Sequence, residues 1–133
     1  MIILDTHILI WAVSSEHNLG RKSRALIDRH WGTGMIAVSA LTFWEVGMLQ
    51  ERGRLQLPTT ISDWRNELVT AGLTEIPLDG TIVIRALDLS GLPGDPADRF
   101  IVATALTQSA ALMTADEKLL NWHHPLERHD GTM

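Results

Sequence analysis

The chain has 133 residues, of which 45% are hydrophobic and 20% are charged, and it contains no cysteine. This length allows one folded domain with its own core and is too short for two ordinary ones, so we expect a single domain over residues 1–133. The composition excludes the disordered and membrane classes. Without cysteine, disulfides and thiolate metal sites are also excluded, so any metal must be bound by oxygen or imidazole ligands.

The formal charge of −5 argues against a protein that binds nucleic acid over a broad surface, because phosphate binding depends on clustered Lys and Arg. Basic residues do cluster at residues 21–24 and 52–54, although a solvated helix face and a cation-favouring helix C-terminus explain them more simply. The first residues, an apolar run closed by Asp5, do not form a secretory signal. No apolar run approaches the roughly 18 residues of a membrane span. We therefore expect a soluble, cytoplasmic protein.

The first part of the chain predicts strands and helices in alternation. A branched, apolar run over residues 1–4 predicts a strand, and helical spacing of apolar residues follows from Ile8 to Ala12. A second helix is expected over about residues 21–30. Residues 35–38 predict a second strand.

Capping residues mark the helices in the middle of the chain. Ser39 is expected to cap a helix that stops at Gly53, because glycine tolerates the left-handed conformation of a C-terminal cap. The segment 60–63 has the pattern of a capping box for a helix that ends at Gly72. A third strand is expected over residues 74–78.

The last part of the chain continues the alternation. Asp79 is expected to cap a helix, and the glycines and prolines of residues 91–96 predict a loop. Asp98 is expected to begin the next helix, and residues 111–113 predict a further strand. The mostly polar segment 123–133 is expected to contain an edge strand followed by a frayed end.

This order of elements predicts an α/β fold: a three-layer α/β/α sandwich with a central, mainly parallel sheet. In such folds the functional crevice lies beyond the carboxyl ends of the strands. Asp5 and Asp116 each follow a predicted strand, Glu45 lies in the helix after the second strand, and Asp98 opens a helix. We therefore expect these four acids to meet at one edge of the sheet.

Glu45 has apolar neighbours three and four residues away on its helix, so its side chain is expected to point at or near the core. A buried, unpaired carboxylate is costly, and several carboxylates together repel one another unless a divalent cation lies among them. Oxygen ligands favour Mg²⁺ or Mn²⁺, and such a site suits hydrolysis of phosphodiester bonds. Each acid also has a structural interpretation, as a turn former (Asp5, Asp116), a helix cap (Asp98) or a solvated helix residue (Glu45).

Three tryptophans and His7 are further candidates for contact with RNA. Trp11, Trp44 and Trp64 lie at apolar helical positions, where a core or dimer-interface role is favoured over stacking on bases. His7 follows the first acid, and a structural hydrogen bond is favoured for it over a role in RNA contact or protonation.

Four short motifs in this order resemble those of the PIN domain family, and more closely those of VapC-like toxins of type II toxin-antitoxin systems. The motifs are ILDTHILIW at residues 3–11, SALTFWEV at 39–46, DPADRFIVATA at 95–105 and TAD at 114–116. The resemblance covers most of the chain. Relatives often have extra residues, including a histidine, where this chain has only residues 91–94.

The resemblance implies a PIN fold and a Mg²⁺- or Mn²⁺-dependent endoribonuclease, a hydrolase that acts on RNA. It also implies a homodimer and a small cognate antitoxin protein that binds near the site. Carried over to this chain, the catalytic and metal-binding acids are Asp5, Glu45, Asp98 and Asp116. The supporting residues are Thr6 and Thr114, which would orient the acids or a water, and Asp95, which we place as secondary to Asp98.

Two other functions fit parts of the pattern. A phosphatase with an aspartyl nucleophile would place that nucleophile after the first strand, but the familiar haloacid-dehalogenase-like pattern has a second Asp where His7 stands. A catalytically silent binding module would act only through its partner, and the presence of all four acids disfavours it.

Overall fold

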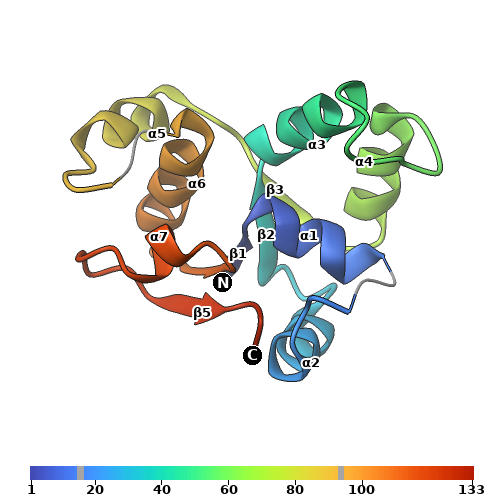
Figure 1. Cartoon of the computed structure of the whole chain (residues 1–133), viewed down its shortest axis with the longest axis horizontal. Coiled ribbons are helices and arrows are strands. Elements are labelled where there is room, and N and C mark those ends of the chain that lie inside the picture. The colour runs from blue at the N-terminus through green and yellow to red at the C-terminus, as the bar shows by residue number, and fades with distance from the viewer. Residues whose placement is uncertain (15–16, 93–94) are drawn as a thin grey trace.

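The computed structural model describes residues 1–14, 17–92 and 95–133 (Figure 1). Residues 93–94 belong to the loop expected over residues 91–96, and they lie outside the described residues. The same holds for part of the segment 91–94, where relatives often have extra residues. In the described part no helix is both long and apolar enough to cross a membrane.

Each predicted strand and helix is found, with one or more helices between successive strands, and the structure adds a short helix, α7 (Glu117–Leu120), that was not predicted. Their bounds are β1 (Ile2–Leu4), α1 (Thr6–Val13), α2 (Arg21–His30), β2 (Ile36–Ser39), α3 (Leu41–Glu51), α4 (Ile61–Thr70), β3 (Thr74–Ile76), α5 (Gly80–Arg85), the 3₁₀ helix η1 (Ala86–Asp88), α6 (Pro96–Thr107), β4 (Ala111–Thr114), α7 (Glu117–Leu120) and β5 (Arg128–Asp130).

The described strands form one sheet in the order β3-β2-β1-β4-β5, and every neighbouring pair is parallel. In the centre, Ile3 of β1 pairs with Ala37 of β2 on one side and with Leu112 of β4 on the other. Parallel pairing places the carboxyl ends of all these strands at the same edge. The α/β fold with a central parallel sheet is thus confirmed.

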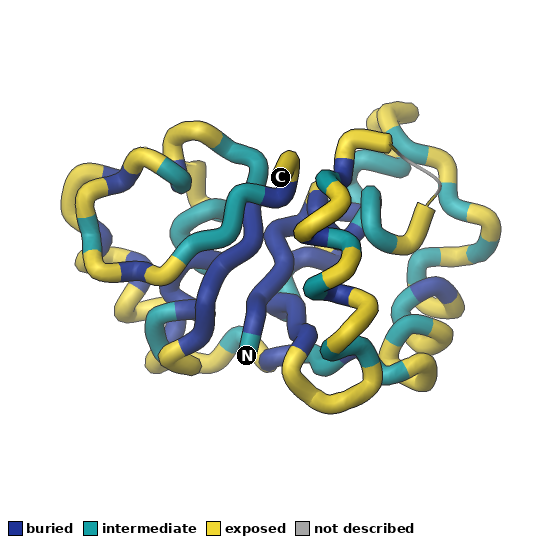
Figure 2. Tube along the Cα trace, turned by 90° about the horizontal axis from the view of Figure 1, so that it is seen from below, coloured by how far each residue is buried: buried dark blue, intermediate teal, exposed yellow. Residues whose placement is uncertain are grey.

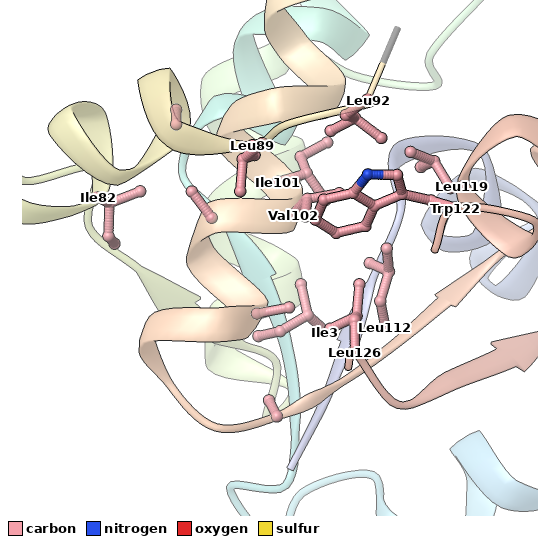
Figure 3. Packing of buried hydrophobic residues seen from close by; sticks show 14 of the residues in the cluster. Ile3, Ile82, Leu89, Leu92, Ile101, Val102, Leu112, Leu119, Trp122 and Leu126 are labelled. Atoms are coloured by element: carbon pink, nitrogen blue, oxygen red, sulfur yellow. The ribbon is translucent and has the colours of Figure 1, made fainter. Parts of the chain in front are cut away.

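Both faces of the sheet are buried because helices pack on each of them, and successive side chains of each strand point to opposite faces. Ile3 and Leu112 pack against α5, α6 and α7, together with Trp122 (Figure 3). Leu4 and Met113 pack on the other face with residues of α1 to α4. Figure 1 shows these two groups of helices on opposite sides of the sheet, and Figure 2 shows the buried strands between them. Burial of each such large side chain contributes roughly 1.5–3 kcal/mol.

Several helix and strand limits differ from the prediction. Helix α6 begins at Pro96, with Asp95 as its cap, so Asp98 lies inside the first turn rather than at the start. Proline favours the first helical position, where its missing N–H is not needed. Ser39 is the last residue of β2 and its Oγ accepts from the backbone N–H of Leu41 (3.2 Å), while Ala40 occupies the cap position of α3. Strand β3 ends earlier than expected, at Ile76.

The end of the chain forms the expected edge strand, β5, but the expectation of a frayed end is wrong. The backbone N–H groups of Gly20 and Lys22 donate to the carbonyl oxygens of Gly131 (2.8 Å) and Met133 (2.9 Å). The start of a helix leaves N–H groups without partners, and the last residues accept from two of those at the start of α2. At Gly20 a Cβ atom would collide with the carbonyl group of Met133, so glycine permits this close approach.

Candidate functional site

Four acids predicted for the site line one cavity of about 320 Å³ at the carboxyl edge of the sheet. The cavity brings together residues from α1, α3, α6 and the segment after β4, which lie far apart in the sequence. Its lining residues are Asp5, Thr6, His7, Trp11, Glu45, Asp95, Asp98, Ala115 and Asp116.

Asp5 lies directly after the central strand β1, and only 8% of its surface is exposed. Its Oδ1 accepts from the backbone N–H of Thr6 (2.8 Å), which caps α1, and its Oδ2 accepts from the hydroxyl of Thr114 (2.7 Å). The pairing of Leu4 with Met113 in the sheet brings Thr114 beside Asp5. Burial raises the pKa of Asp5, and the two hydrogen bonds oppose this shift.

Glu45 reaches the cavity from the second turn of α3. Its Oε1 accepts a 2.5 Å hydrogen bond from the hydroxyl of Thr6, which also lies 3.2 Å from the hydroxyl of the buried Thr42. Burial raises the pKa of Glu45, the bond from Thr6 lowers it, and the nearby charges of Asp5 and Asp95 raise it further. The Thr6 residue therefore contacts two of the acids at once.

Asp98 lies in the first turn of α6 and is half-buried. The pKa of its carboxyl is raised to about 7, chiefly by burial and then by repulsion from the neighbouring acids. Those acids are Asp5, Asp95, Asp116 and Glu45. The described residues donate no hydrogen bond to its carboxylate. Since Asp98 is not the cap of α6, the structural interpretation of this acid is wrong.

Asp116 and Asp95 cap helices as well as lining the cavity. Asp116 accepts from the backbone N–H of Lys118 (2.9 Å) in α7, and its own N–H donates to the Thr114 hydroxyl (3.1 Å). Asp95 accepts from the backbone N–H of Ala97 (3.0 Å) in α6. A cap uses one carboxylate oxygen, so this role does not prevent the other oxygen from contacting a cation. Thr114 links Asp5 to Asp116.

The donor set fits a hard divalent cation, because every candidate ligand is a carboxylate oxygen and the acids repel one another without a counter-charge. In the described part of the chain, no three acid or histidine side chains are close enough to hold one ion as they stand. Magnesium is commonly held by one or two carboxylates plus waters and phosphate oxygens, so three protein ligands are not needed. The assignment of all four acids as ligands stays a prediction.

The model of the PIN domain family matches residues 2–122. The chain belongs to the PIN domain family. It is also 31% identical to ribonuclease VapC22 of Mycobacterium tuberculosis over 129 residues, which cover 93% of each chain.

Solved structures agree with this PIN fold. A DNA-bound VapBC structure from Salmonella typhimurium matches with a TM-score of 0.71 and 15% identity, over 97% of this chain and 96% of that one. VapBC2 from Rickettsia felis, bound to a promoter DNA fragment, matches with a TM-score of 0.69 and 18% identity, over 97% and 98%. At such low identities these structures show the fold alone.

The tryptophans of this PIN domain differ from one another in burial. Trp64 is 6% exposed and belongs to the core, and Trp11 is half-buried at the rim of the acid cavity. Trp44, in contrast, is 60% exposed, so a place in the core is wrong for it. Helix α3 turns its buried side, with Phe43 and Val46, toward the sheet, and Trp44 then points to solvent.

Arg24, from the first basic cluster, and His7 were both considered in the sequence, and the structure places each of them. Arg24 donates to the carbonyl oxygens of Trp11 (3.2 Å) and Ala12 (3.4 Å), so it binds the C-terminus of α1. His7 is exposed and makes no side-chain hydrogen bond within the described residues, so the structural bond expected for it is not found. Its ring lies 6.3 Å from that of Trp11.

Thr42 is the residue of this site that sequence reasoning missed. It is fully buried and its hydroxyl meets that of Thr6, which in turn holds Glu45. Thr42 stands three residues before Glu45, so both lie on the same side of α3. That spacing was the available signal, but a threonine inside a helix pattern does not stand out.

Proposed function

We propose that this PIN domain is a divalent-metal-dependent endoribonuclease and the toxin of a VapBC-type toxin-antitoxin pair. The observation that carries the proposal is the single cavity lined by Asp5, Glu45, Asp98 and Asp116. The similarity to ribonuclease VapC22 over most of both chains supports RNA as the substrate. The structural similarity to VapBC assemblies supports a protein partner of the antitoxin class.

The proposed site residues divide into acids that hold the cation and hydroxyls that position those acids. Asp5, Glu45, Asp98 and Asp116 would hold Mg²⁺ or Mn²⁺, with Asp95 in a lesser role. When bound, the cation supplies Lewis-acid polarisation of the scissile phosphate and activation of water. Thr114 orients Asp5, and Thr6 orients Glu45, through the hydrogen bonds described above. Such a scheme does not require the ribose 2′ hydroxyl as nucleophile.

A homodimer and a cytoplasmic location complete the proposal. The homodimer is what the resemblance to VapC-like toxins implies. The location follows from the toxin role, because an antitoxin and cellular RNA would meet the chain in the cytoplasm. The size of the purified chain, measured by light scattering, tests the dimer.

Cleavage of cellular RNA by the purified chain tests the function. We expect cleavage with Mn²⁺ or Mg²⁺, no cleavage in EDTA, and no cleavage by Asp98→Asn at any metal concentration. The matched control is Asp28→Asn, which removes an exposed acid on α2 that does not line the cavity and should cleave like the parent. Cleavage that persists in EDTA contradicts the metal-dependent mechanism.

Expression in bacteria provides a second test that needs no purified RNA target. The parent chain should arrest growth, and Asp98→Asn should not, at equal protein levels on an immunoblot. Normal growth with the parent chain, together with no cleavage of cellular RNA in vitro, would favour the catalytically silent binding module instead.

A further inference from the structure

A second cavity, of about 200 Å³, adjoins the acid cavity on the side of α3. The two cavities share His7, Glu45 and Asp95, so they adjoin at these residues. The residues that line only the second cavity are Trp44, Met48, Leu49, Arg52 and Ala97. A ligand that leaves the acid cavity past Glu45 therefore meets this surface.

The outer side of α3 gives this second cavity its chemistry. Trp44, Met48 and Arg52 follow one another at intervals of four residues, so they form one stripe along the helix and its end. Trp44 is 60% exposed and sits next to Glu45 in the chain. Arg52 is exposed and forms no ion pair within the described residues. The stripe thus presents an aromatic ring and a cation beside the acid cavity.

An RNA strand needs such a surface, because the acids themselves repel phosphate. The chain has a net charge of −5, and the acid cavity adds no attraction for a polyanion beyond that of its cation. Stacking of an unpaired base on an indole does not depend on charge and tolerates every base. A guanidinium binds a phosphate oxygen pair directly.

We propose that Trp44 stacks on an unpaired base next to the scissile phosphate, and that Arg52 binds a phosphate of the same strand. The occupant is single-stranded RNA, and the inference rests on the ribonuclease function proposed above. The shared lining with the acid cavity and the exposed ring and cation favour RNA over a protein at this surface. Trp44 then acts in substrate binding, and it does not take part in the chemical step.

Binding and cleavage by matched variants test this role. The probe for binding is a fluorescein-labelled pool of short, single-stranded RNAs of random sequence, measured by anisotropy in the uncleaving Asp98→Asn background. Trp44→Ala should weaken binding by about tenfold, the loss typical of one stacked base. Trp44→Phe should retain most of the affinity, and Leu87→Ala, which removes a 79% exposed leucine on η1, should retain all of it.

Cleavage kinetics separate binding from chemistry. With an otherwise unchanged chain, Trp44→Ala should raise KM about tenfold and change kcat less than about twofold. Arg52→Ala should raise KM and reduce its dependence on salt, because one phosphate contact is lost. A double-stranded pool should bind equally to the parent and to Trp44→Ala, since paired bases cannot stack on the ring.

Three results would overturn the inference. Unchanged KM and affinity in Trp44→Ala, with cleavage by the parent intact, would reject it while leaving the ribonuclease function standing. Loss of oligomer mass in Trp44→Ala, with RNA affinity unchanged, would show a protein interface instead. Failure of the parent both to bind and to cleave RNA would reject the ribonuclease function and this inference together.

Discussion

The hydroxyl of Thr114 donates a 2.7 Å hydrogen bond to Oδ2 of Asp5, although the two residues lie 109 positions apart. The parallel pairing of β1 with β4 creates this contact, because it places the ends of both strands side by side. The same hydroxyl accepts from the N–H of Asp116 (3.1 Å), so one buried side chain orders two acids of the site.

Replacement of Thr114 by valine should impair both stability and cleavage. The change keeps the shape of the side chain and removes a hydroxyl that serves as donor and acceptor. We expect the free energy of unfolding to fall by about 1–2 kcal/mol and kcat/KM to fall by about 10- to 100-fold. Thr114→Ser keeps the hydroxyl and should restore most of both. Denaturant unfolding and a cleavage assay measure the two effects, and full cleavage by Thr114→Val would contradict the orienting role.

The contribution of Asp98 to the stability of the metal-free chain should fall as pH rises. The pKa of Asp98 is about 7 in the folded chain, against 3.8 for an ordinary aspartate, so the folded state holds this proton more tightly. The stabilisation is complete below about pH 4 and is lost as pH rises through about 7. The raised pKa values of Asp5 and Glu45 act with the same sign.

Unfolding in urea with EDTA, measured from about pH 4 to about pH 8, tests this dependence. The difference between the parent and Asp98→Asn isolates the Asp98 contribution, because other titrating groups cancel. We expect this difference to change by about 1–2 kcal/mol across the range, after allowance for screening at a half-buried group. A flat difference would show that Asp98 does not hold its proton in the folded state.

Divalent cations should stabilise the chain through the acid cavity. A ligand that binds only the folded state adds about 2.7 kcal/mol when present at 100 times its Kd. Mn²⁺ or Mg²⁺ should therefore raise the Tm of the parent, and the rise should be much smaller for Asp98→Asn. Differential scanning fluorimetry measures this without any RNA. Equal rises in both proteins would place the cation elsewhere.

Asp95 and Asp98 should respond differently to substitution. Asp95→Ala removes the cap of α6 and should lower the free energy of unfolding by about 1 kcal/mol, whereas Asp95→Asn can still cap and should not. We expect Asp95→Asn to keep cleavage within about tenfold of the parent, because this acid supports the site from its edge. Asp98→Asn should lose about 100-fold or more. Equal losses in both Asn variants would make Asp95 a principal acid.

Local patterns predicted much of this molecule because the relevant forces act over short stretches. Branched apolar runs indicated the strands, and the alternation with helices implied parallel pairing and a shared carboxyl edge. Asp5 and Asp116 could be assigned to that edge because Asp5 directly follows β1 and Asp116 lies two residues after the end of β4. The glycines that end α3 and α4, Gly53 and Gly72, have positive φ angles as expected.

Side-chain direction in α3 could not be predicted in the same way. Apolar residues occur on most sides of this helix, so its periodicity does not select the buried side. Packing of Phe43 and Val46 against the sheet determines which side of α3 is buried, and it leaves Trp44 exposed. The contact of Met133 with the first turn of α2 could not be predicted from the sequence either, because backbone atoms make it.

The sequence alone determined which elements form, in which order, and which acids follow the strands, since these depend on residue type and spacing. Only the tertiary structure decided which groups touch: Thr114 with Asp5, Thr6 with Glu45 and Thr42, and Trp44 with solvent. The physical reason is that strand register and helix rotation are set by the packing of the whole core, so contacts between distant residues follow from many side chains acting together.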